Sequence, residues 1–268
     1  MTAPHTITPA QLARLIGTPE APALIDICID DDFNEDPRLI PTAVRHPFKH
    51  IETLVPDLKG RRVVVICQKG KKLSQGAMAL LRTHGINAEV LEGGIFGWRD
   101  FGGLLLPASA LPARGALWVT RHRPKIDRIA CPWLIRRFID PDARFLFVAQ
   151  SEVLAVADKF DAIPFDVEGA ELSHCEGACS FDTLLEKFQL TMPTLSAMAK
   201  IIRAADGTPD AHAPEAAGLL ALSLGLSRMY RDDLEQLDAA MPLYDALYRW
   251  ARDAQGETHD WAAHGGAK

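Results

Sequence analysis

The sequence has no long run of hydrophobic residues and no obvious targeting segment. Although 48% of its 268 residues are hydrophobic, no stretch reaches the roughly 18 consecutive apolar residues that a membrane-spanning helix needs. The first residues, MTAPHTITPAQLARLIG, lack the basic start and continuous apolar segment of a secretion signal. We therefore expect a soluble, cytoplasmic protein without a membrane partner, large enough for one or two packed cores.

The sequence also has few cysteines, and it has fewer basic than acidic residues. The five cysteines form an odd set in a chain without an export signal, which argues against a framework of disulfides. Each cysteine is therefore considered singly, as a core residue, a nucleophile or a metal ligand. The formal net charge of -6 disfavours a protein that coats nucleic acid, because phosphate binding needs an excess of lysine and arginine. A local basic patch and the oligomeric state both stay open.

Short β-branched segments alternate with helical patterns over the first hundred residues. Residues 23–25 and 62–66 are short apolar runs typical of buried strands, and residues 88–91 form a third. A helical pattern runs over 73–83 and is ended by Gly85. This alternation predicts an α/β domain with a parallel sheet that helices cover on both faces.

The middle of the chain contains a Gly/Pro-rich segment with little periodicity. Residues 101–116, FGGLLLPASALPARGA, contain three glycines and two prolines. We interpret residues 105–116 as a linker between a domain at 1–104 and a domain at 117–268. The second domain is predicted to be a mostly helical α+β domain. Strands are expected near 118–120, 145–148 and 162–165, and helices near 180–188, 194–205, 214–225 and 231–253. A further helix is expected to carry Ile129 to Phe138, with Asp127 as its cap and a distortion at Pro132.

Cys67 directly follows the strand expected at 62–66. A loop that closes onto the N-terminus of a helix directs several backbone N–H groups at one place, which makes an anion-binding site. Lysines there stabilise a thiolate, and glycine permits the tight turn. The pattern favours Cys67 as a nucleophile that attacks an anionic sulfur compound and then holds a persulfide; the alternative is a buried, inert cysteine. The residues expected to bind the donor are Gln68, Lys69, Gly70, Lys71 and Lys72.

The first domain resembles the single-domain rhodaneses through four motifs in order. They are Leu24-Ile25-Asp26, Leu39-Ile40-Pro41-Thr42-Ala43, the loop Cys67–Lys72, and Leu91-Glu92-Gly93-Gly94-Ile95-Phe96-Gly97-Trp98. The resemblance implies a rhodanese-like parallel-sheet fold and a persulfide on Cys67. It also implies transfer of the outer sulfur from a small anionic donor to a thiol or to cyanide, with no cofactor.

Three residues depart from the rhodanese pattern. Lys72 stands where the family often has arginine, Leu73 where it has a small polar residue, and Cys28 where it has arginine. Lysine provides a point charge without the bidentate fork of arginine, so these departures affect the choice of substrate more than the nucleophile. The loop also lacks the terminal arginine of related phosphatases, so phosphatase activity is not expected.

The segment His174-Cys175-Glu176-Gly177-Ala178-Cys179 has the composition of a metal site. Histidine, cysteine and carboxylates are common ligands of transition metals, but the cysteine spacing is not that of a zinc knuckle. A divalent metal site centred on His174 would need further carboxylates, and the alternative is a loop histidine with two incidental thiols. The candidate carboxylates are Asp166, Glu171, Asp182 and Asp206.

Arg136 and Arg137 lie in an otherwise apolar stretch. We expect at least one of them to turn inward, where arginine needs a carboxylate or an anion. The candidate partners are Asp166, Glu171 and Asp182. This predicts a metal or oxyanion site between the basic stretch 121–137 and the acidic region around His174; the alternative is a buried arginine–carboxylate pair without a ligand.

Residues 118 to about 250 resemble the C-terminal domain of the chromate-resistance protein ChrB. The resemblance rests on the ordered motifs Val119-Thr120-Arg121, Asp127-Arg128-Ile129, Trp133 to Asp140, Phe165-Asp166, Glu171 to His174, Cys179 to Asp182, Pro214 to Leu219 and Tyr244 to Tyr248. It implies a role in chromate resistance, where some members are chromate-responsive regulators with a different N-terminal half. Arg203 stands where relatives often carry histidine.

Three functions are open from the sequence. The leading one is a rhodanese-type sulfurtransferase fused to a ChrB-like domain that acts in chromate or oxyanion stress. The first alternative is a non-catalytic regulator, in which Cys67 detects chromate or an oxidant and the second half binds DNA or a partner. The second alternative is a metal-dependent redox protein centred on His174.

Overall fold

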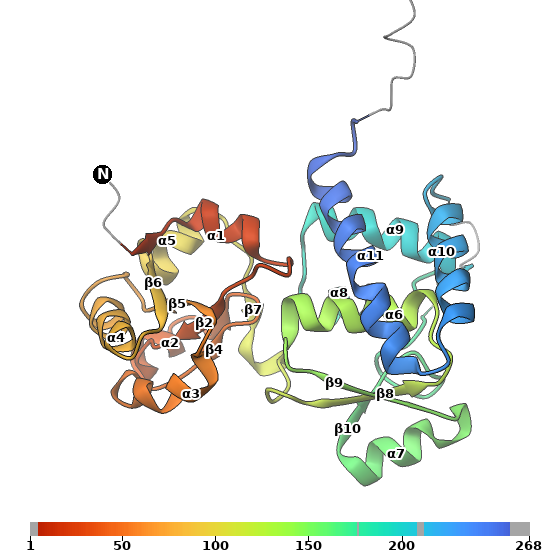
Figure 1. Cartoon of the computed structure of the whole chain (residues 1–268), viewed down its shortest axis with the longest axis horizontal. Helices are drawn as coiled ribbons and strands as arrows, with labels where there is room; N and C mark the ends of the chain where they lie inside the picture. The colour runs from red at the N-terminus through yellow and green to blue at the C-terminus, as the bar shows by residue number, and fades with distance from the viewer. Residues whose placement is uncertain (1–4, 176, 208–211, 258–268) are drawn as a thin grey trace, which may run out of the picture.

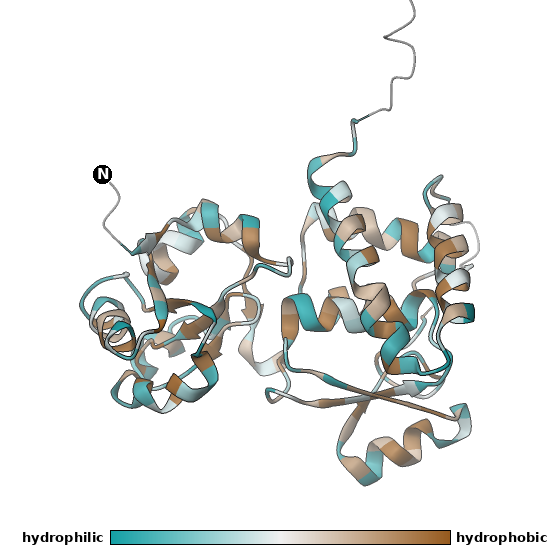
Figure 2. Cartoon of the chain, in the orientation of Figure 1, coloured by the Kyte–Doolittle hydropathy of each residue, from teal (hydrophilic) through white to brown (hydrophobic). Residues whose placement is uncertain are grey.

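The chain folds into two lobes that follow each other in sequence (Figure 1). The computed structural model describes residues 5–175, 177–207 and 212–257. The first lobe contains the elements drawn in red to yellow, and the second contains those in green to blue. Figure 2 shows that the strands of both lobes are coloured mostly as hydrophobic, as expected for segments at the centre of a core.

A five-stranded parallel sheet forms the centre of the N-terminal lobe. Its strand order is β1-β6-β5-β2-β4, and every neighbouring pair is parallel. The strands are β1 (Thr6–Ile7), β2 (Ala23–Asp26), β4 (Val44–Arg45), β5 (Arg62–Ile66) and β6 (Asn87–Leu91). The predicted parallel-sheet α/β domain is therefore confirmed.

Helices cover both faces of this sheet, because alternate strand residues point to opposite sides. Val64 packs with residues of α1 (Pro9–Leu15) and α5 (Gly94–Asp100) on one face. Val63 packs with residues of α3 (Val55–Leu58) and α4 (Lys72–Thr83) on the other. Two short helical segments, α2 (Asp30–Asn34) and η1 (Phe48–Leu54), complete the lobe.

The segment interpreted as a linker is partly built into the N-terminal lobe. Strand β7 (Leu106–Pro107) pairs antiparallel with β3 (Arg38–Leu39), and the short helix η2 (Ala108–Ala110) follows it. Leu106 is fully buried. The free part of the connection is therefore shorter than 105–116.

The C-terminal lobe combines a small parallel sheet with most of the helices. Strand β8 (Leu117–Arg121) lies between β10 (Ala162–Pro164) and β9 (Arg144–Val148). Helix α7 (Val153–Phe160), preceded by η4 (Gln150–Glu152), packs on one face of the sheet. The remaining helices lie on the other side (Figure 1): α6 (Ile126–Leu134), α8 (Ser180–Lys187), α9 (Pro193–Asp206), α10 (Ala216–Met229) and α11 (Asp233–Asp253). The predicted mostly helical character of this half is confirmed.

Helix α6 departs from regular geometry where the sequence predicts a distortion. Pro132 lies inside α6, and a π-helical turn, η3 (Ile135–Ile139), continues it. Proline lacks the N–H that a regular helix needs, and a wider turn accommodates this loss. Asp127 was expected to cap α6, but it occupies the first turn, after Lys125 at the cap position. That expectation is wrong because the Asp127 carboxylate turns into a buried cluster described below.

The two lobes are in direct contact. A Cβ atom on Gly17 would lie 2.4 Å from the Phe138 ring, so only glycine lets the two backbones approach this closely. The Tyr248 hydroxyl donates a hydrogen bond of 3.3 Å to the Ile16 carbonyl oxygen. The Thr42 N–H donates one of 3.2 Å to the Phe138 carbonyl oxygen. Buried apolar residues of both lobes consequently form one continuous cluster.

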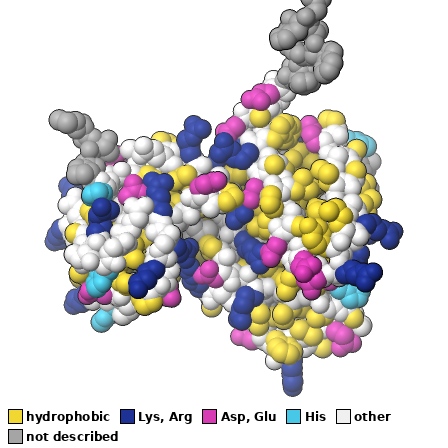
Figure 3. All heavy atoms as spheres, in the orientation of Figure 1, with side chains coloured by type: hydrophobic (Ala, Val, Ile, Leu, Met, Phe, Trp, Pro, Cys, Tyr) yellow, Lys and Arg dark blue, Asp and Glu magenta, His cyan; other side chains and the backbone are white. Residues whose placement is uncertain are grey.

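Acidic and basic side chains are mixed over the face drawn in Figure 3. The same view shows hydrophobic side chains grouped on the C-terminal lobe. Leu220, Leu222, Leu224 and Met229 of α10 are exposed. Within the described ranges, no helix combines the length and the apolar character needed to cross a membrane.

Candidate functional site

Cys67 lies at the carboxyl end of β5, directly before the loop that leads into α4. Its side chain is buried, with 5% of the residue exposed. The sulfur lies 3.1 Å from the Oγ of Ser74, which is buried in the first turn of α4 and donates to the Lys71 carbonyl oxygen. A serine hydroxyl at this distance can also donate to a thiolate. Ser74 was missed from the sequence, although its place in the first helical turn beyond the loop is a usable signal.

The loop is held in shape by the glycines of a second motif. Gly94 has a φ of +60°, and a Cβ atom there would lie 2.1 Å from the Cys67 carbonyl oxygen and 2.5 Å from the Gly70 nitrogen. The N–H groups of Ile95 and Phe96 donate to the carbonyl oxygens of Cys67 and Gln68, at 3.0 and 3.1 Å. The start of α5 therefore fixes the backbone on both sides of the cysteine.

The loop residues predicted to bind an anionic donor share one turn with Cys67. Lys69, Lys71 and Lys72 are exposed, and Lys71 stands at the cap position of α4. The first N–H groups of a helix have no partner within it and attract anions. The Gln68 side chain donates a hydrogen bond of 3.3 Å to Glu35. The three lysines and the helix N-terminus thus lie in the turn that directly follows Cys67.

Three of the other cysteines are poor nucleophiles. Burial raises the pKa of the Cys28 thiol, and the neighbouring Asp26 carboxylate raises it further. Burial likewise raises the pKa of the Cys131 and Cys179 thiols, with a further contribution from Asp127. Because the thiolate is the reactive form, these groups stay unreactive near neutral pH.

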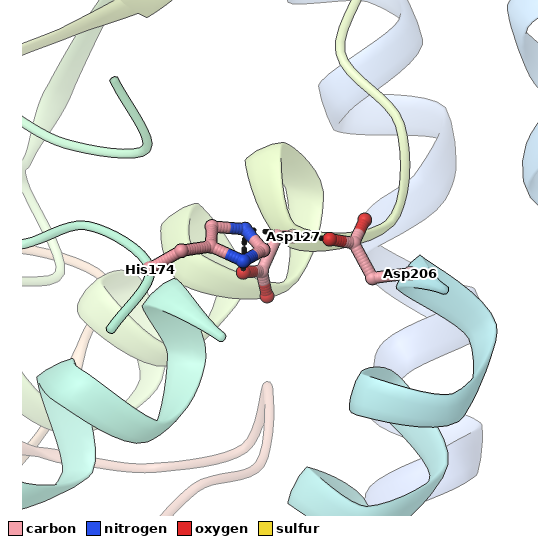
Figure 4. A group of neighbouring side chains, drawn as sticks. All are labelled: Asp127, His174 and Asp206. Carbon is pink, nitrogen blue, oxygen red and sulfur yellow. Dashed lines mark ion pairs between the residues drawn. The ribbon is translucent and has the colours of Figure 1, made fainter. Parts of the chain in front are cut away.

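A second cluster of polar side chains lies in the C-terminal lobe. His174 Nε2 is 3.1 Å from Asp166 Oδ1 and 3.4 Å from both Asp127 Oδ2 and Asp206 Oδ2. Asp127 comes from the first turn of α6, Asp206 from the end of α9, and His174 from the loop before α8 (Figure 4). Asp166 follows β10 by two residues. Four separate parts of the chain therefore meet at one imidazole nitrogen.

The two buried aspartates of this cluster have different partners. Asp166 forms ion pairs with Arg128 at 3.2 Å and Arg121 at 3.4 Å, and it accepts a hydrogen bond of 2.9 Å from the Ser180 hydroxyl. Asp127 accepts one of 2.6 Å from the Ser180 N–H. No arginine or lysine is paired with Asp127 among the residues described. Asp166 is thus paired with two arginines, whereas the cationic partner of Asp127 among the described residues is the His174 imidazole, at 3.4 Å, when that ring is protonated.

These environments shift the pKa values of the side chains in the cluster in different directions. Burial, together with the Asp206 and Asp166 carboxylates, raises the pKa of Asp127 to about 7. Burial and the nearby Asp166 also raise the pKa of Asp206. Although burial opposes ionisation of Asp166, its hydrogen bonds and arginine partners hold its pKa below the usual value. The hydrogen bond to Asp166 raises the pKa of His174. The three carboxylates are therefore matched in number by Arg121, Arg128 and a protonated His174, and they exceed the cations by one when the imidazole is neutral.

Only part of the predicted carboxylate set reaches His174. Asp166 and Asp206 do, whereas Glu171 pairs with Lys187 and is exposed. Asp182 pairs with Arg203 and accepts a hydrogen bond of 3.0 Å from the Cys179 N–H at the start of α8. Asp127 and Ser180 were not indicated for this cluster by the sequence, whereas Arg121 and Arg128 belong to the basic stretch 121–137 that was expected to face it.

The prediction that Asp166, Glu171 or Asp182 pairs with Arg136 or Arg137 is wrong. Arg136 pairs with Asp238 at 3.0 Å, and Arg137 forms a bidentate pair with Asp245 at 2.7 and 2.8 Å. Asp245 also accepts a hydrogen bond of 2.8 Å from the Trp133 indole. Helix α11 packs against α6, so its carboxylates, and not those near His174, meet these arginines.

The fold and the cysteine loop define a rhodanese-like domain joined to a mostly helical second domain. Residues 8–101 match the rhodanese-like domain family, and residues 118–251 match the family described as ChrB, C-terminal domain. Because the second match spans half of the chain, the protein belongs to the family that carries the ChrB C-terminal domain.

Known proteins resemble each half of the chain. Protein ChrB of Cupriavidus metallidurans (strain ATCC 43123 / DSM 2839 / NBRC 102507 / CH34) is 37% identical over 170 residues, which cover 56% of this chain and 50% of that protein. The chain thus spans about half the length of that relative.

Solved structures resemble the N-terminal lobe. A rhodanese-related protein of Thermoplasma volcanium is 22% identical with a TM-score of 0.33, over 38% of this chain and 96% of that one. A thiosulfate sulfurtransferase of Pseudomonas aeruginosa is 24% identical with a TM-score of 0.32, over 37% and 19%. A rhodanese-like domain protein of Staphylococcus aureus is 23% identical with a TM-score of 0.32, over 35% and 89%.

Proposed function

We propose that this protein is a rhodanese-type sulfurtransferase that forms a persulfide on Cys67 and acts in chromate or oxyanion stress. The observation that carries the proposal is the setting of Cys67. Its buried sulfur lies 3.1 Å from the Ser74 hydroxyl, in a loop with three exposed lysines at the N-terminus of α4. That combination suits a thiolate that must accept an anionic partner.

The reaction needs two transfers of one sulfur atom. The Cys67 thiolate attacks the outer sulfur of thiosulfate, the S–S bond of thiosulfate breaks, and sulfite leaves with the bonding electron pair. The persulfide then gives its outer sulfur to a thiolate or to cyanide, and the Cys67 thiolate is the leaving group. The lysines and the first N–H groups of α4 attract the anionic donor, while the Ser74 oxygen accepts a hydrogen bond from the Cys67 thiol before the thiol ionises.

The link to chromate or oxyanion stress comes from the second half of the chain. The ChrB-family domain occupies residues 118–251 and packs directly against the rhodanese-like lobe through Phe138 and Tyr248. A sulfurtransferase joined to this domain would deliver reduced sulfur where an oxidising anion is handled.

The test is sulfur transfer by the full-length protein with thiosulfate as donor and cyanide as acceptor. We expect one added sulfur on the Cys67 peptide by mass spectrometry, and loss of turnover in Cys67→Ser. Cys175→Ser is the matched control, because this exposed thiol lies in the other lobe, and it should keep full turnover. Added sulfur on Cys175, or turnover by Cys67→Ser, would show that the nucleophile is misassigned. Chromate-dependent oxidation of Cys67 without any turnover would favour the regulator instead.

A further inference from the structure

In the C-terminal lobe, three carboxylates lie within hydrogen-bonding distance of one imidazole nitrogen. His174 Nε2 lies 3.1 to 3.4 Å from oxygens of Asp127, Asp166 and Asp206. A single N–H can donate well to only one of them. At least two of these carboxylates therefore receive no hydrogen bond from His174, an arrangement that a bound cation would stabilise.

Asp127 provides an independent observation. Its side chain is 2% exposed, and Oδ1 is buried without a hydrogen-bond partner among the described residues. The thiol of Cys179 comes close to Asp127, but thiols are weak donors and its sulfur is hydrogen-bonded to Asp182. A buried carboxylate oxygen without a partner is strongly unfavourable unless something outside the protein satisfies it.

The spacing of the cluster fits the ligands of one ion. Metal–nitrogen and metal–oxygen bonds to zinc and similar ions are about 2.1 Å long, so neighbouring ligand atoms lie about 3.0 Å apart in an octahedron and about 3.4 Å apart in a tetrahedron. One ligand atom each from Asp127, His174 and Asp206 can be chosen within 4.8 Å of one another. The measured nitrogen-to-oxygen distances of 3.1 to 3.4 Å fall in this range.

The charge of the cluster selects a cation over an oxyanion. Arg121 and Arg128 both form ion pairs with Asp166, so both guanidinium groups are already engaged with a carboxylate. An anion placed here would face the carboxylates of Asp127 and Asp206, whereas a cation would bridge them.

We propose that Asp127, His174 and Asp206 bind a divalent first-row transition-metal ion, with Asp166 as a further oxygen ligand. One imidazole with two or three carboxylates suits manganese, iron(II) or zinc, which accept mixed nitrogen and oxygen ligands. Asp127 forms the buried wall of the site. His174 and Asp206, whose side chains are 43% and 23% exposed, give the ion a path from solvent (Figure 4).

The first test is direct binding to the full-length protein after treatment with a chelator. Titration calorimetry with Mn²⁺, Zn²⁺ and, without oxygen, Fe²⁺ should show one ion bound per chain. Asp127→Asn, His174→Ala and Asp206→Asn should each weaken binding by at least about tenfold, as loss of even outer contacts at metal sites does. Glu171→Gln is the matched control, because this carboxylate pairs with Lys187 outside the cluster, and its affinity should equal that of the wild type.

The second test separates a metal site from a structural ion-pair network. In metal-free protein, Asp127→Asn should keep or raise the melting temperature, because it removes a buried carboxylate that no arginine or lysine of the described residues pairs with. The variant should also lose the increase in melting temperature that we expect the metal to cause in the wild type. A lower melting temperature for Asp127→Asn, with no metal bound by the wild type, would overturn the proposal. So would binding of chromate or sulfate in place of a cation, or metal binding that all three variants retain. None of these outcomes depends on the sulfurtransferase activity.

Discussion

At the scale of single residues, five cysteines with the same side chain have different chemistry because their surroundings differ. Burial raises the pKa of the thiols of Cys28, Cys131 and Cys179, which keeps them protonated and unreactive. Cys67 is also buried, but it ends a strand, contacts the Ser74 hydroxyl and precedes a lysine-rich helix start. Position in the fold, and not burial alone, therefore distinguishes the proposed nucleophile from the core cysteines.

Lys72 offers the most direct test of the loop charge. It is the first residue of α4 and is exposed, so substitution should leave the fold intact. Lys72→Arg should preserve or raise thiosulfate turnover, because the positive charge remains. Lys72→Glu should lower turnover by at least about tenfold, because a carboxylate repels both the thiolate and the anionic donor.

The control for this charge reversal is Lys59→Glu. Lys59 is exposed in the same lobe but lies just before β5, at the opposite end of the strand from Cys67. Its replacement should leave turnover near the wild-type value in a steady-state assay. Equal rates for Lys72→Glu and the wild type would mean that Lys72 is only a solvated loop charge.

At the scale of elements, the site depends on the close approach of two turns that are separate in sequence. The turn after β5 carries Cys67, and the turn after β6 carries Gly93 and Gly94. Their backbones are joined by hydrogen bonds from Ile95 and Phe96. Gly93 and Gly94, like Gly70, are therefore needed for the conformation of the cysteine loop.

Gly94→Ala tests this dependence. A Cβ atom would lie 2.1 Å from the Cys67 carbonyl oxygen, at a φ of +60° that alanine rarely adopts, so we expect a loss of about 1–3 kcal/mol in unfolding free energy and loss of turnover. Gly76→Ala is the control: it lies in α4 with open space around its Cβ position, and it should raise the unfolding free energy by about 0.5–1 kcal/mol. Denaturant unfolding measures both. A neutral Gly94→Ala would show that the two turns can separate.

At the scale of the whole molecule, two complete folds share one apolar cluster. Gly17 lets the N-terminal lobe approach Phe138 and Tyr248 of the C-terminal lobe. Tyr248 is fully buried and bonded to the Ile16 carbonyl. Each lobe nevertheless has its own parallel sheet with helices on both sides. We therefore expect two folding units that stabilise each other through their contact.

Fragments 1–111 and 112–268 test this expectation. The boundary keeps β7 with its partner β3 in the first fragment. Each fragment should unfold cooperatively, with a lower melting temperature than the full chain because Phe138 and Tyr248 lose apolar contacts. Calorimetry of the fragments and the full chain makes the comparison. Two fragments that fail to fold would instead indicate one shared core.

The sequence by itself determined the features that depend on local patterns. The run at 62–66, the helix that begins near residue 72 and the loop between them follow from β-branched residues, helical periodicity and Gly70, and they placed Cys67 at the end of β5. The three strands of the second half, and its helices α6 and α8 to α11, were predicted in the same way, whereas α7 was not. These signals are local because a strand or helix repeats its pattern over neighbouring residues.

Only the tertiary structure decided which charged side chains meet. Asp127 was expected to cap a helix, yet it faces His174 and Asp206, because α6, the loop before α8 and the end of α9 converge. Arg137 meets Asp245 because α11 packs against α6. Such pairings depend on how helices far apart in sequence pack together, and a single charged residue carries no periodic signal of its partner.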